Sequence, residues 1–271
     1  RLDRLPDRYC LLDVSAELRE RQRDRIADEI PELAGRAVWL DTLPDHFRGV
    51  VLANEVLDAV PVSLVVWRED GLHERGVGVE GETFVWIDRP LADGPVRAQA
   101  EALSVQAPYL TEIAPRVTAL VATLAARLEH GALLFIDYGF GRGEYYHPQR
   151  DRGTLMGHYR HHALDDPFHL PGLQDLTAHV DFTAVAEAGV AAGLRFAGYT
   201  TQANFLMNCG ITELLSAVPA AHAHAYLPLA AQAQKLMSPS EMGELFKVIA
   251  LTRGIESPLI GFRRGDLSRL L

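Results

Sequence analysis

Three short apolar runs in the first 55 residues are each followed at once by acidic, hydroxyl or amide side chains. A helix-like segment, residues 16–30, separates the first run from the second. Strands and helices in this order are typical of a doubly wound α/β sheet, whose ligands bind beyond the carboxyl ends of the strands. The runs and their polar residues are 9–14 with Asp13 and Ser15, 36–40 with Asp41 and Thr42, and 48–53 with Asn54 and Glu55.

The rest of the chain supplies further strands and helices, and we expect a single α/β domain over residues 1–271. Short alternating strands separated by DG and EG turns predict an antiparallel ribbon inserted at residues 62–90. The almost wholly apolar run 133–140 contains Asp137 and is typical of a buried parallel strand. We also predict helices at 111–129 and 181–192, an Ala-rich helical stretch at 204–236, and strands at 194–200 and 246–252.

Composition narrows the class of partner. The formal net charge is −10, from 36 acidic and 26 basic side chains, which disfavours nucleic acid and suits a basic protein segment or a small cationic cofactor. Cys10 and Cys209 have neither metal-ligand spacing nor a disulfide framework, so we expect a reducing, cytoplasmic compartment. The sequence has no apolar run of 18 residues, and we expect no membrane span.

A glycine-rich string, GFGRG, contains Gly139, Gly141 and Gly143. A nucleotide-binding glycine loop must follow the first strand and open a helix, so that backbone N–H groups meet the ligand. This string follows a late strand and continues into EYYHP, which is not a typical helix start. We therefore interpret it as a flexible turn rather than a cofactor loop.

Several long strings make the sequence resemble a known family, the MidA-like methyltransferases, which include assembly factors of mitochondrial respiratory complex I. The resemblance spans nearly the whole chain. It implies a class I S-adenosylmethionine (SAM)-dependent methyltransferase fold, with a mostly parallel sheet of seven strands, and an activity similar to that of protein arginine N-methyltransferases. The strings that carry it are LLDVSAELRERQ, ANEVLDAVPV, LLFIDYGF, EYYHPQRDRGTLMGHYRHH, DDPF, GLQDLTAHVDF, TTQANFL and MGELFKVIAL.

The resemblance also implies where the cofactor binds. In class I methyltransferases an acid after the family's second strand accepts hydrogen bonds from the ribose, and a polar residue after its third strand holds the adenine. The runs 9–14 and 36–40 correspond to these two strands. Asp13 with Ser15 and Asp41 with Thr42 therefore occupy the two positions, and we add Asn54 to the predicted cofactor site. The family's first strand and glycine-rich loop would precede residue 1, so we expect residues 1–271 alone to bind SAM weakly or not at all.

The segment that follows the third predicted strand carries the predicted catalytic residues. An arginine substrate is cationic, and carboxylates can hold its guanidinium through paired charge-assisted hydrogen bonds. Glu55 and Asp58 are three residues apart, so on a helical turn they share one face, and we predict that they form this clamp beside Asn54. In the alternative, Glu55 caps a helix and Asp58 faces solvent; Asp137 is then the next candidate.

Residues 141–181 are rich in His, Asp, Pro and Gly, and a loop of this length is usually functional. The family resemblance makes the segment a loop over the substrate; the alternative is an ordinary surface loop. His158, His161, His162 and His169 would permit a metal site, but no zinc-type ligand pattern is present, and we predict no metal. The residues predicted to cover or orient the substrate are Tyr138, His158, Tyr159, His161 and His179.

The resulting hypothesis is a SAM-dependent N-methyltransferase that acts on an arginine of a partner protein, with a respiratory-complex subunit as the implied substrate. Three alternatives stay open: a methyltransferase for another nitrogen, a non-catalytic assembly chaperone that keeps the fold for protein binding, and a metal hydrolase. The oligomeric state is not determined by the sequence, and a homodimer is one option.

Overall fold

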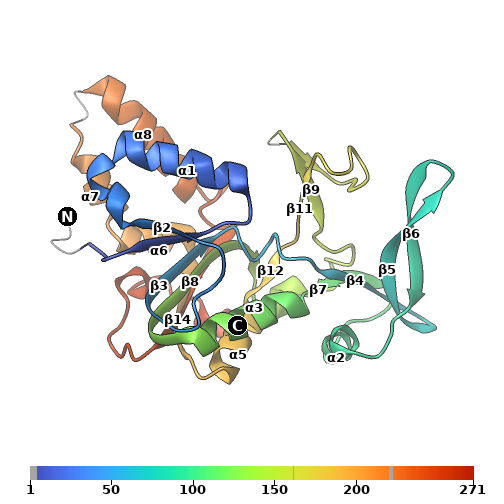
Figure 1. The fold of residues 1–271 in the computed structure, drawn as a ribbon. Helices are drawn as coiled ribbons and strands as arrows, with labels where there is room; N and C mark the ends of the chain where they lie inside the picture. The colour runs from blue at the N-terminus through green and yellow to red at the C-terminus, as the bar shows by residue number, and fades with distance from the viewer. Residues whose placement is uncertain (1–4, 161, 220–221) are drawn as a thin grey trace. The chain divides into compact units, whose positions relative to one another are not determined.

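A computed structural model describes residues 5–160, 162–219 and 222–271, and these form two compact units (Figure 1). The first unit ends at Phe47 and the second is Arg48–Leu271. The first unit contains β1 (Tyr9–Leu12), α1 (Ala16–Glu29), the 3-10 helix η1 (Pro31–Arg36) and β2 (Ala37–Leu40).

The first unit is the predicted strand–helix–strand. Strands β1 and β2 pair in parallel, with Tyr9 opposite Ala37 and Leu12 opposite Leu40. Ser15 caps α1 by accepting a hydrogen bond from the backbone N–H of Leu18 at 3.3 Å. Strand β1 ends at Leu12, which leaves Asp13 in the connection to the helix.

The second unit contains the main sheet, whose central strand β8 lies between β14 and a pair of shorter neighbours, β3 and β12. The backbone N–H of Glu55 donates to the carbonyl of Ile136 at 2.9 Å, and Gly49 adjoins Gly131, so β3 and β8 run in the same direction. Strand β14 is antiparallel to both β8 and β13. The strands are β3 (Phe47–Asn54), β8 (Leu128–Phe140), β12 (Val180–Asp181), β13 (Arg195–Thr201) and β14 (Phe246–Arg253).

The hydrophobic core lies around the two central strands. Leu133, Phe135, Ile249 and Leu251 are fully buried, as expected for strands that are covered on both faces. Helices α3 (Pro115–Arg127) and α5 (Phe182–Ala191) contact each other and the sheet. The predicted mostly parallel sheet is confirmed, since β14 alone opposes the other strands described here.

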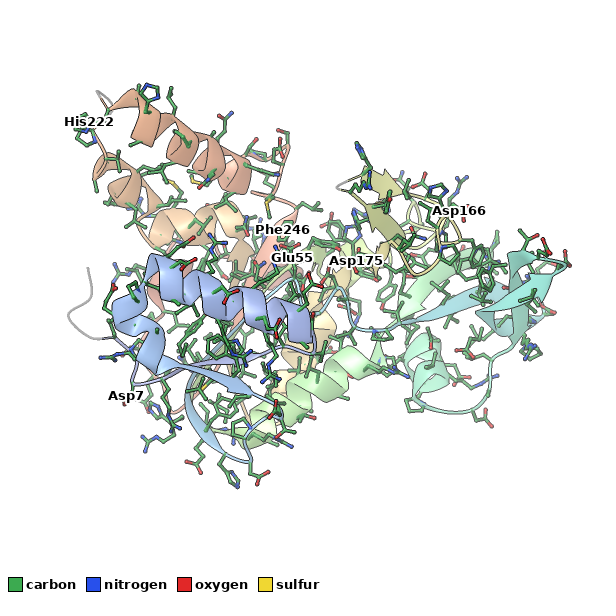
Figure 2. All side chains as sticks on the ribbon, turned by 45° about the horizontal axis from the view of Figure 1, so that its top comes forward. Asp7, Glu55, Asp166, Asp175, His222 and Phe246 are labelled. Atoms are coloured by element: carbon green, nitrogen blue, oxygen red, sulfur yellow. The ribbon has the colours of Figure 1, made fainter. Side chains whose placement is uncertain are left out.

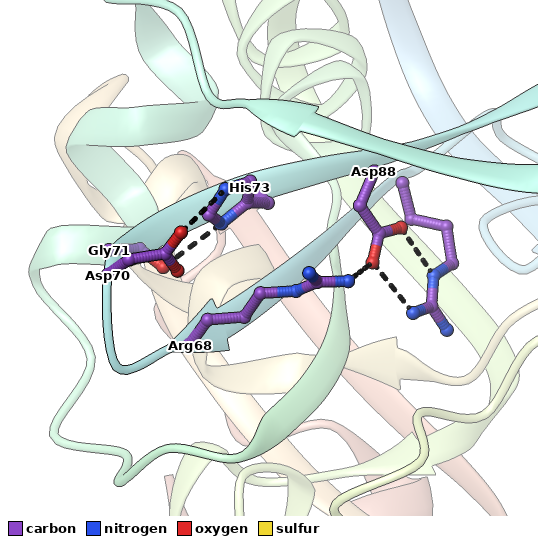
Figure 3. A network of polar contacts seen from close by, with 6 residues as sticks. Arg68, Asp70, Gly71, His73 and Asp88 are labelled. Carbon is purple, nitrogen blue, oxygen red and sulfur yellow. Dashed lines mark hydrogen bonds and ion pairs between the residues drawn. The ribbon is translucent and has the colours of Figure 1, made fainter.

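A separate antiparallel sheet has the strand order β6-β5-β4-β7 and includes the predicted ribbon. One boundary prediction was wrong: residues 111–113, predicted as the start of a helix, belong to β7 because they pair with β4, and α3 begins only at Pro115. A network of ion pairs ties β4, β5 and β6 together through Asp88, as Figure 3 shows. The elements are β4 (Ser63–Arg68), β5 (Gly71–Glu80), β6 (Thr83–Pro90), α2 (Pro95–Glu101) and β7 (Tyr109–Ile113).

Residues 141–181 are more regular than predicted. Three short strands form a sheet of their own, with the order β10-β9-β11. The GFGRG prediction was wrong in one respect, since a helix of four residues, α4 (Arg142–Tyr145), begins within the string after Gly141. A Cβ at Gly139 would overlap the carbonyl of Val180, so this glycine permits close backbone packing. The strands are β9 (Met156–Tyr159), β10 (His162–Leu164) and β11 (Asp175–Thr177).

The predicted Ala-rich helix is divided into three. Gly210 adopts a left-handed φ of +87° between the first two helices and so ends the first of them. These are α6 (Gln202–Asn208), α7 (Ile211–Ser216) and α8 (Ala223–Met237), and the 3-10 helices η2 (Ile260–Phe262) and η3 (Ser268–Leu270) follow β14. None of the helices in the described ranges is long and apolar enough to cross a membrane.

Candidate functional site

In the first unit, polar side chains gather where β1 and β2 end. Asp13 accepts a hydrogen bond from the backbone N–H of Ser15 at 2.9 Å and one from Gln22 Nε2 at 2.9 Å. Gln22 in turn accepts a bond from Trp39 Nε1 at 3.0 Å, which links α1 to β2. These contacts fix the Asp13 carboxylate at the carboxyl end of its strand.

The geometry of this cluster suits the predicted cofactor contacts. Each carboxylate oxygen of Asp13 receives one protein hydrogen bond, which leaves acceptor capacity for the hydroxyls of a ribose. The Asp41 side chain is exposed, and one of its oxygens accepts a hydrogen bond from Arg19 Nη1 at 2.8 Å. Thr42 is exposed beside it. The roles of these residues stay predictions.

In the second unit, the carboxylate of Asp137 organises the turn that follows β3. Three successive backbone N–H groups, those of Val56, Leu57 and Asp58, donate to its Oδ2 at 3.2, 2.9 and 3.3 Å. Its Oδ1 accepts from the backbone N–H of Tyr138 at 3.1 Å. Asp137 is fully buried, so the turn and the end of β8 are held by one carboxylate.

The turn brings a second buried carboxylate, that of Asp58, next to Asp137. Burial raises the pKa of Asp137 to about 7, and the charge of Asp58 adds to this rise. Burial also raises the pKa of Asp58, an effect that the hydroxyl of Tyr138 partly opposes. Among the described residues, Asp58 Oδ1 has no hydrogen-bond partner although it is buried. An unpartnered carboxylate oxygen is a candidate contact for a cationic ligand.

The predicted helical clamp was wrong in its geometry. Glu55 has a left-handed φ of +51°, and the next three N–H groups converge on Asp137 rather than on the carbonyls of a helix. The segment is therefore a turn, in which Glu55 is exposed and Asp58 is buried. Asn54 Nδ2 donates to Glu55 Oε1 at 3.0 Å, so these two predicted residues do lie together. Whether the three residues bind substrate stays a prediction.

Two of the predicted substrate-covering residues meet at this edge of the sheet. The His179 ring packs edge-on against Tyr138, with 5.2 Å between ring centroids, and against Phe140 at 5.2 Å. Burial lowers the pKa of His179 to about 4, and the charges of Arg150 and Lys247 act in the same direction. His179 is therefore neutral at physiological pH.

The other substrate-covering residues lie elsewhere or are not described. His158 and Tyr159 are on β9, in the small three-stranded sheet, where His158 faces Asp175 across the β9–β11 pair. His161 lies outside the described residues. Figure 2 shows Asp166 and Asp175 on this small sheet and its loop, and Glu55 at the end of β3. Within the described ranges, His, Cys, Asp and Glu side chains form no group of three or more that could hold a metal.

Two buried acids at the site, Glu112 and Asp137, were not assigned a leading role from the sequence. Glu112 accepts hydrogen bonds from the backbone N–H groups of Thr154 and Leu155 at 2.7 and 2.8 Å, and from the Tyr145 hydroxyl at 3.2 Å. An acid within the apolar string YLTEI was the available signal, but the last three residues of that string were assigned to a helix. Asp137 was named only as the next candidate, because its three backbone donors are far away in sequence.

The arrangement defines a class of protein. A mostly parallel sheet with flanking helices, and carboxylates at the carboxyl ends of its strands, is the architecture of class I SAM-dependent methyltransferases. A family profile described as "Putative S-adenosyl-L-methionine-dependent methyltransferase" matches residues 3–200. The chain belongs to this family.

Two crystal structures of Burkholderia thailandensis proteins are similar to the chain over nearly its full length. Both are 51% identical to it and cover 98% of it, with TM-scores of 0.93 and 0.94. The chain spans 71% and 69% of those two chains. The second of these structures contains S-adenosyl-homocysteine.

Curated relatives are more distant. The zebrafish (Danio rerio) protein arginine methyltransferase NDUFAF7, mitochondrial, is 29% identical over 230 residues, which are 79% of this chain and 50% of the relative. The mouse (Mus musculus) protein of the same name is 31% identical over 221 residues, covering 79% of this chain and 48% of the relative. The chain thus spans about half the length of these relatives. Together the comparisons confirm the predicted family and fold class and, at the level of the family, the enzyme class and its cofactor.

Proposed function

We propose that the protein containing this chain transfers the methyl group of SAM to a guanidinium nitrogen of arginine in a partner protein. The observation that carries the proposal is the Asp58 carboxylate, which is buried and has one unpartnered oxygen at the carboxyl edge of the sheet. The names of the zebrafish and mouse relatives agree with this substrate class. A respiratory-complex subunit as the partner follows from the family resemblance and is part of the proposal.

Different residues of the chain would bind the cofactor and the substrate. In the first unit, Asp13, Ser15, Asp41 and Thr42 would hold the cofactor, which supplies an activated methyl group when bound. Methyl transfer from SAM to nitrogen is a displacement at an already activated methyl group, so positioning of the two reactants supplies most of the catalysis. The chain's own contribution is therefore to bind the guanidinium and to receive the proton that it releases.

Two carboxylates are available for these tasks. Asp58 is held in place because its own N–H is bound by Asp137, and its free oxygen can accept a hydrogen bond from the guanidinium. Its raised pKa makes it a better proton acceptor than an ordinary aspartate. Glu55 is exposed three residues earlier in the same turn and would contact the guanidinium separately, rather than as a pair with Asp58 on one helical face.

The test compares methylarginine in the proteomes of cells that contain or lack the gene. We expect specific methylarginine peptides to disappear with the gene and to return with the wild-type protein. Glu55→Gln and Asp58→Asn should each lower the restored methylation at least about tenfold, equivalent to ~1.4 kcal/mol in the barrier, while SAM affinity stays nearly unchanged. Asp7→Asn, at an exposed position of the first unit, is the matched control and should restore methylation fully.

Two outcomes would reject the proposal. Unchanged methylarginine after deletion, with loss of methyl groups from another nitrogen, would assign a different substrate. No change in any methylated peptide, together with retained binding to partner proteins, would favour a non-catalytic assembly role.

A further inference from the structure

Strand β6 forms an edge of the antiparallel sheet (Figure 1). In the part of the chain that the structure describes, β6 pairs with β5 alone, and its backbone makes no hydrogen bond to any other segment. Just beyond the strand, the N–H of Leu91 points inward and donates to the carbonyl of Leu72 at 2.9 Å. Because inward and outward groups alternate along an antiparallel strand, the backbone groups of Phe84, Trp86 and Asp88 point outward.

This edge lacks most of the features that protect edge strands from pairing. Protected edges usually carry a lysine, a bulge or a proline within the strand. Strand β6 has no lysine, its register with β5 is continuous over eight residues, and Pro90 is its last residue. Its central string FVWI is wholly apolar, with Phe84 45% exposed and both Trp86 and Ile87 37% exposed. A regular apolar edge of this kind is a template for another strand.

One face of the β5–β6 hairpin extends the apolar surface beside this edge. Val77 lies opposite Trp86 and Val79 lies opposite Phe84, and residues directly opposite each other share a face. Val77 is 58% exposed and Val79 is 64% exposed. Phe168 packs against both aromatic rings, with ring centroids 4.7 Å from Trp86 and 6.1 Å from Phe84. The aromatic side chains are therefore held in place while their surface stays open to a ligand.

Exposed acids flank this apolar face. Glu80 and Glu82 lie at the tip of the hairpin, and Asp166 lies in the loop that packs on the aromatic rings (Figure 2). Within the described ranges, none of these three carboxylates forms an ion pair. The surroundings of the edge are therefore complementary to basic side chains.

The arginines of the hairpin do not neutralise these acids. Arg75 shares the apolar face, but Asp88 binds its guanidinium at both ends, with Nε–Oδ1 and Nη2–Oδ2 distances of 2.8 and 2.9 Å (Figure 3). Arg68 binds the same carboxylate from β4. Arg89 lies opposite Glu74, on the other face of the hairpin.

The same charges disfavour two other occupants of the edge. If a second copy of β6 paired with Phe84 opposite its Trp86, Glu82 would lie opposite its Asp88, and like charges opposite each other are destabilising. Aligning the two tryptophans instead would place Phe84 opposite a carboxylate. A membrane surface with anionic lipids attracts basic segments, whereas the residues that flank this edge are acidic.

We propose that β6 binds an extended segment of a partner protein as an added strand, with apolar side chains along the apolar face and arginine or lysine beside Glu80, Glu82 and Asp166. Backbone hydrogen bonds to the outward groups of Phe84 and Trp86 hold the segment, and the side chains determine which segment is chosen. This binding site is separate from methyl transfer and goes beyond the proposed function.

The experiment selects random dodecapeptides, displayed on phage, on the purified gene product that carries residues 1–271. Phe84→Lys is used for counter-selection, because it places a protecting lysine on the edge. We expect the enriched peptides to have apolar residues at every second position, arginine or lysine next to the apolar run, and few acids. Thermal unfolding of each variant reports whether it is folded.

The affinity of one enriched peptide, labelled with a fluorophore, is then measured by anisotropy. Phe84→Lys should weaken binding at least about tenfold and Glu82→Lys several-fold, whereas Phe84→Tyr and the distant Asp7→Asn should leave it nearly unchanged. Two copies of the peptide carry N-methyl groups on one or the other set of alternate residues. One of them should bind at least about tenfold more weakly, because it cannot donate to the edge.

Several results would overturn the proposal. Peptides that are enriched equally on Phe84→Lys, or whose apolar residues recur every three to four positions, would exclude an added strand. Equal affinity of the parent peptide and both N-methylated copies would do the same. Self-association of the gene product that Phe84→Lys abolishes would assign the edge to a second copy, and binding to phosphatidylglycerol vesicles that this variant abolishes would assign it to a membrane.

Discussion

Replacing Asp137 by asparagine should change how the stability of the protein depends on pH. Asp137 is fully buried next to Asp58, and these two features raise its pKa from an ordinary value of 3.8 to about 7 in the folded state. The folded protein therefore binds this proton more tightly than the unfolded chain does. By linkage, the stabilisation from protonated Asp137 is fully present below about pH 4 and is lost as the pH rises through about 7.

The size of the effect follows from the same values. Between the two pKa values the free energy of unfolding falls by about 1.4 kcal/mol for each pH unit. Over the practical interval from about pH 5 to about pH 8, the wild type should lose roughly 2–3 kcal/mol relative to Asp137→Asn, which cannot titrate. The asparagine oxygen can still accept hydrogen bonds from the turn, so the variant is expected to fold.

Urea unfolding of both proteins at several pH values measures this difference directly. The quantity to compare is the wild-type minus variant free energy of unfolding, with equal slopes against urea as the check on two-state behaviour. Asp58→Asn removes the neighbouring charge and should move the wild-type transition toward lower pH. A wild-type minus Asp137→Asn difference that is constant from pH 5 to pH 8, within the scatter given by Asp7→Asn, would refute the reasoning.

Two further substitutions test the structure near the site. Glu112→Ala leaves the N–H groups of Thr154 and Leu155 without their acceptor and should lower the free energy of unfolding by about 3 kcal/mol or more. The control Glu82→Ala, at an exposed position, should change it by less than about 0.5 kcal/mol. Equal effects of the two variants in urea unfolding would contradict the role of Glu112. Gly139→Ala forces a Cβ against the Val180 carbonyl and should lower the free energy of unfolding by about 1–3 kcal/mol. Gly143→Ala has open space around it and should not destabilise the protein. Thermal unfolding of both variants measures the difference, and an unchanged stability of Gly139→Ala would refute the close packing.

Local sequence patterns were sufficient for the longer strands, but not for the small sheet β10-β9-β11 within residues 141–181. Apolar runs followed by polar side chains predicted β1, β2, β3 and β8, because successive apolar residues are typical of parallel strands and polar residues are typical of the connections that follow them. The DG and EG turns also predicted the antiparallel ribbon correctly. The boundary at Pro115 was missed, since apolar residues of β7 continue the helical stripe of α3 without interruption.

The site was only partly predictable because its geometry depends on contacts distant in sequence. The spacing of Glu55 and Asp58 permits a helical turn, but the carboxylate of Asp137, about 80 residues away, collects the N–H groups and forms a different turn. Asp58 was therefore named for a clamp on a shared face, whereas the structure buries it apart from exposed Glu55.

The measurement that tests the central claim most directly is methyl transfer from SAM carrying an isotopically labelled methyl group. The gene product that carries residues 1–271 is incubated with an arginine peptide from a partner protein found by the cellular comparison, and fragmentation mass spectrometry locates the label. We predict that the label appears on a guanidinium nitrogen, and that Asp58→Asn lowers its rate at least about tenfold while Asp7→Asn does not. Label on a lysine or on another nitrogen, or an Asp58→Asn rate equal to that of the wild type, would contradict the account.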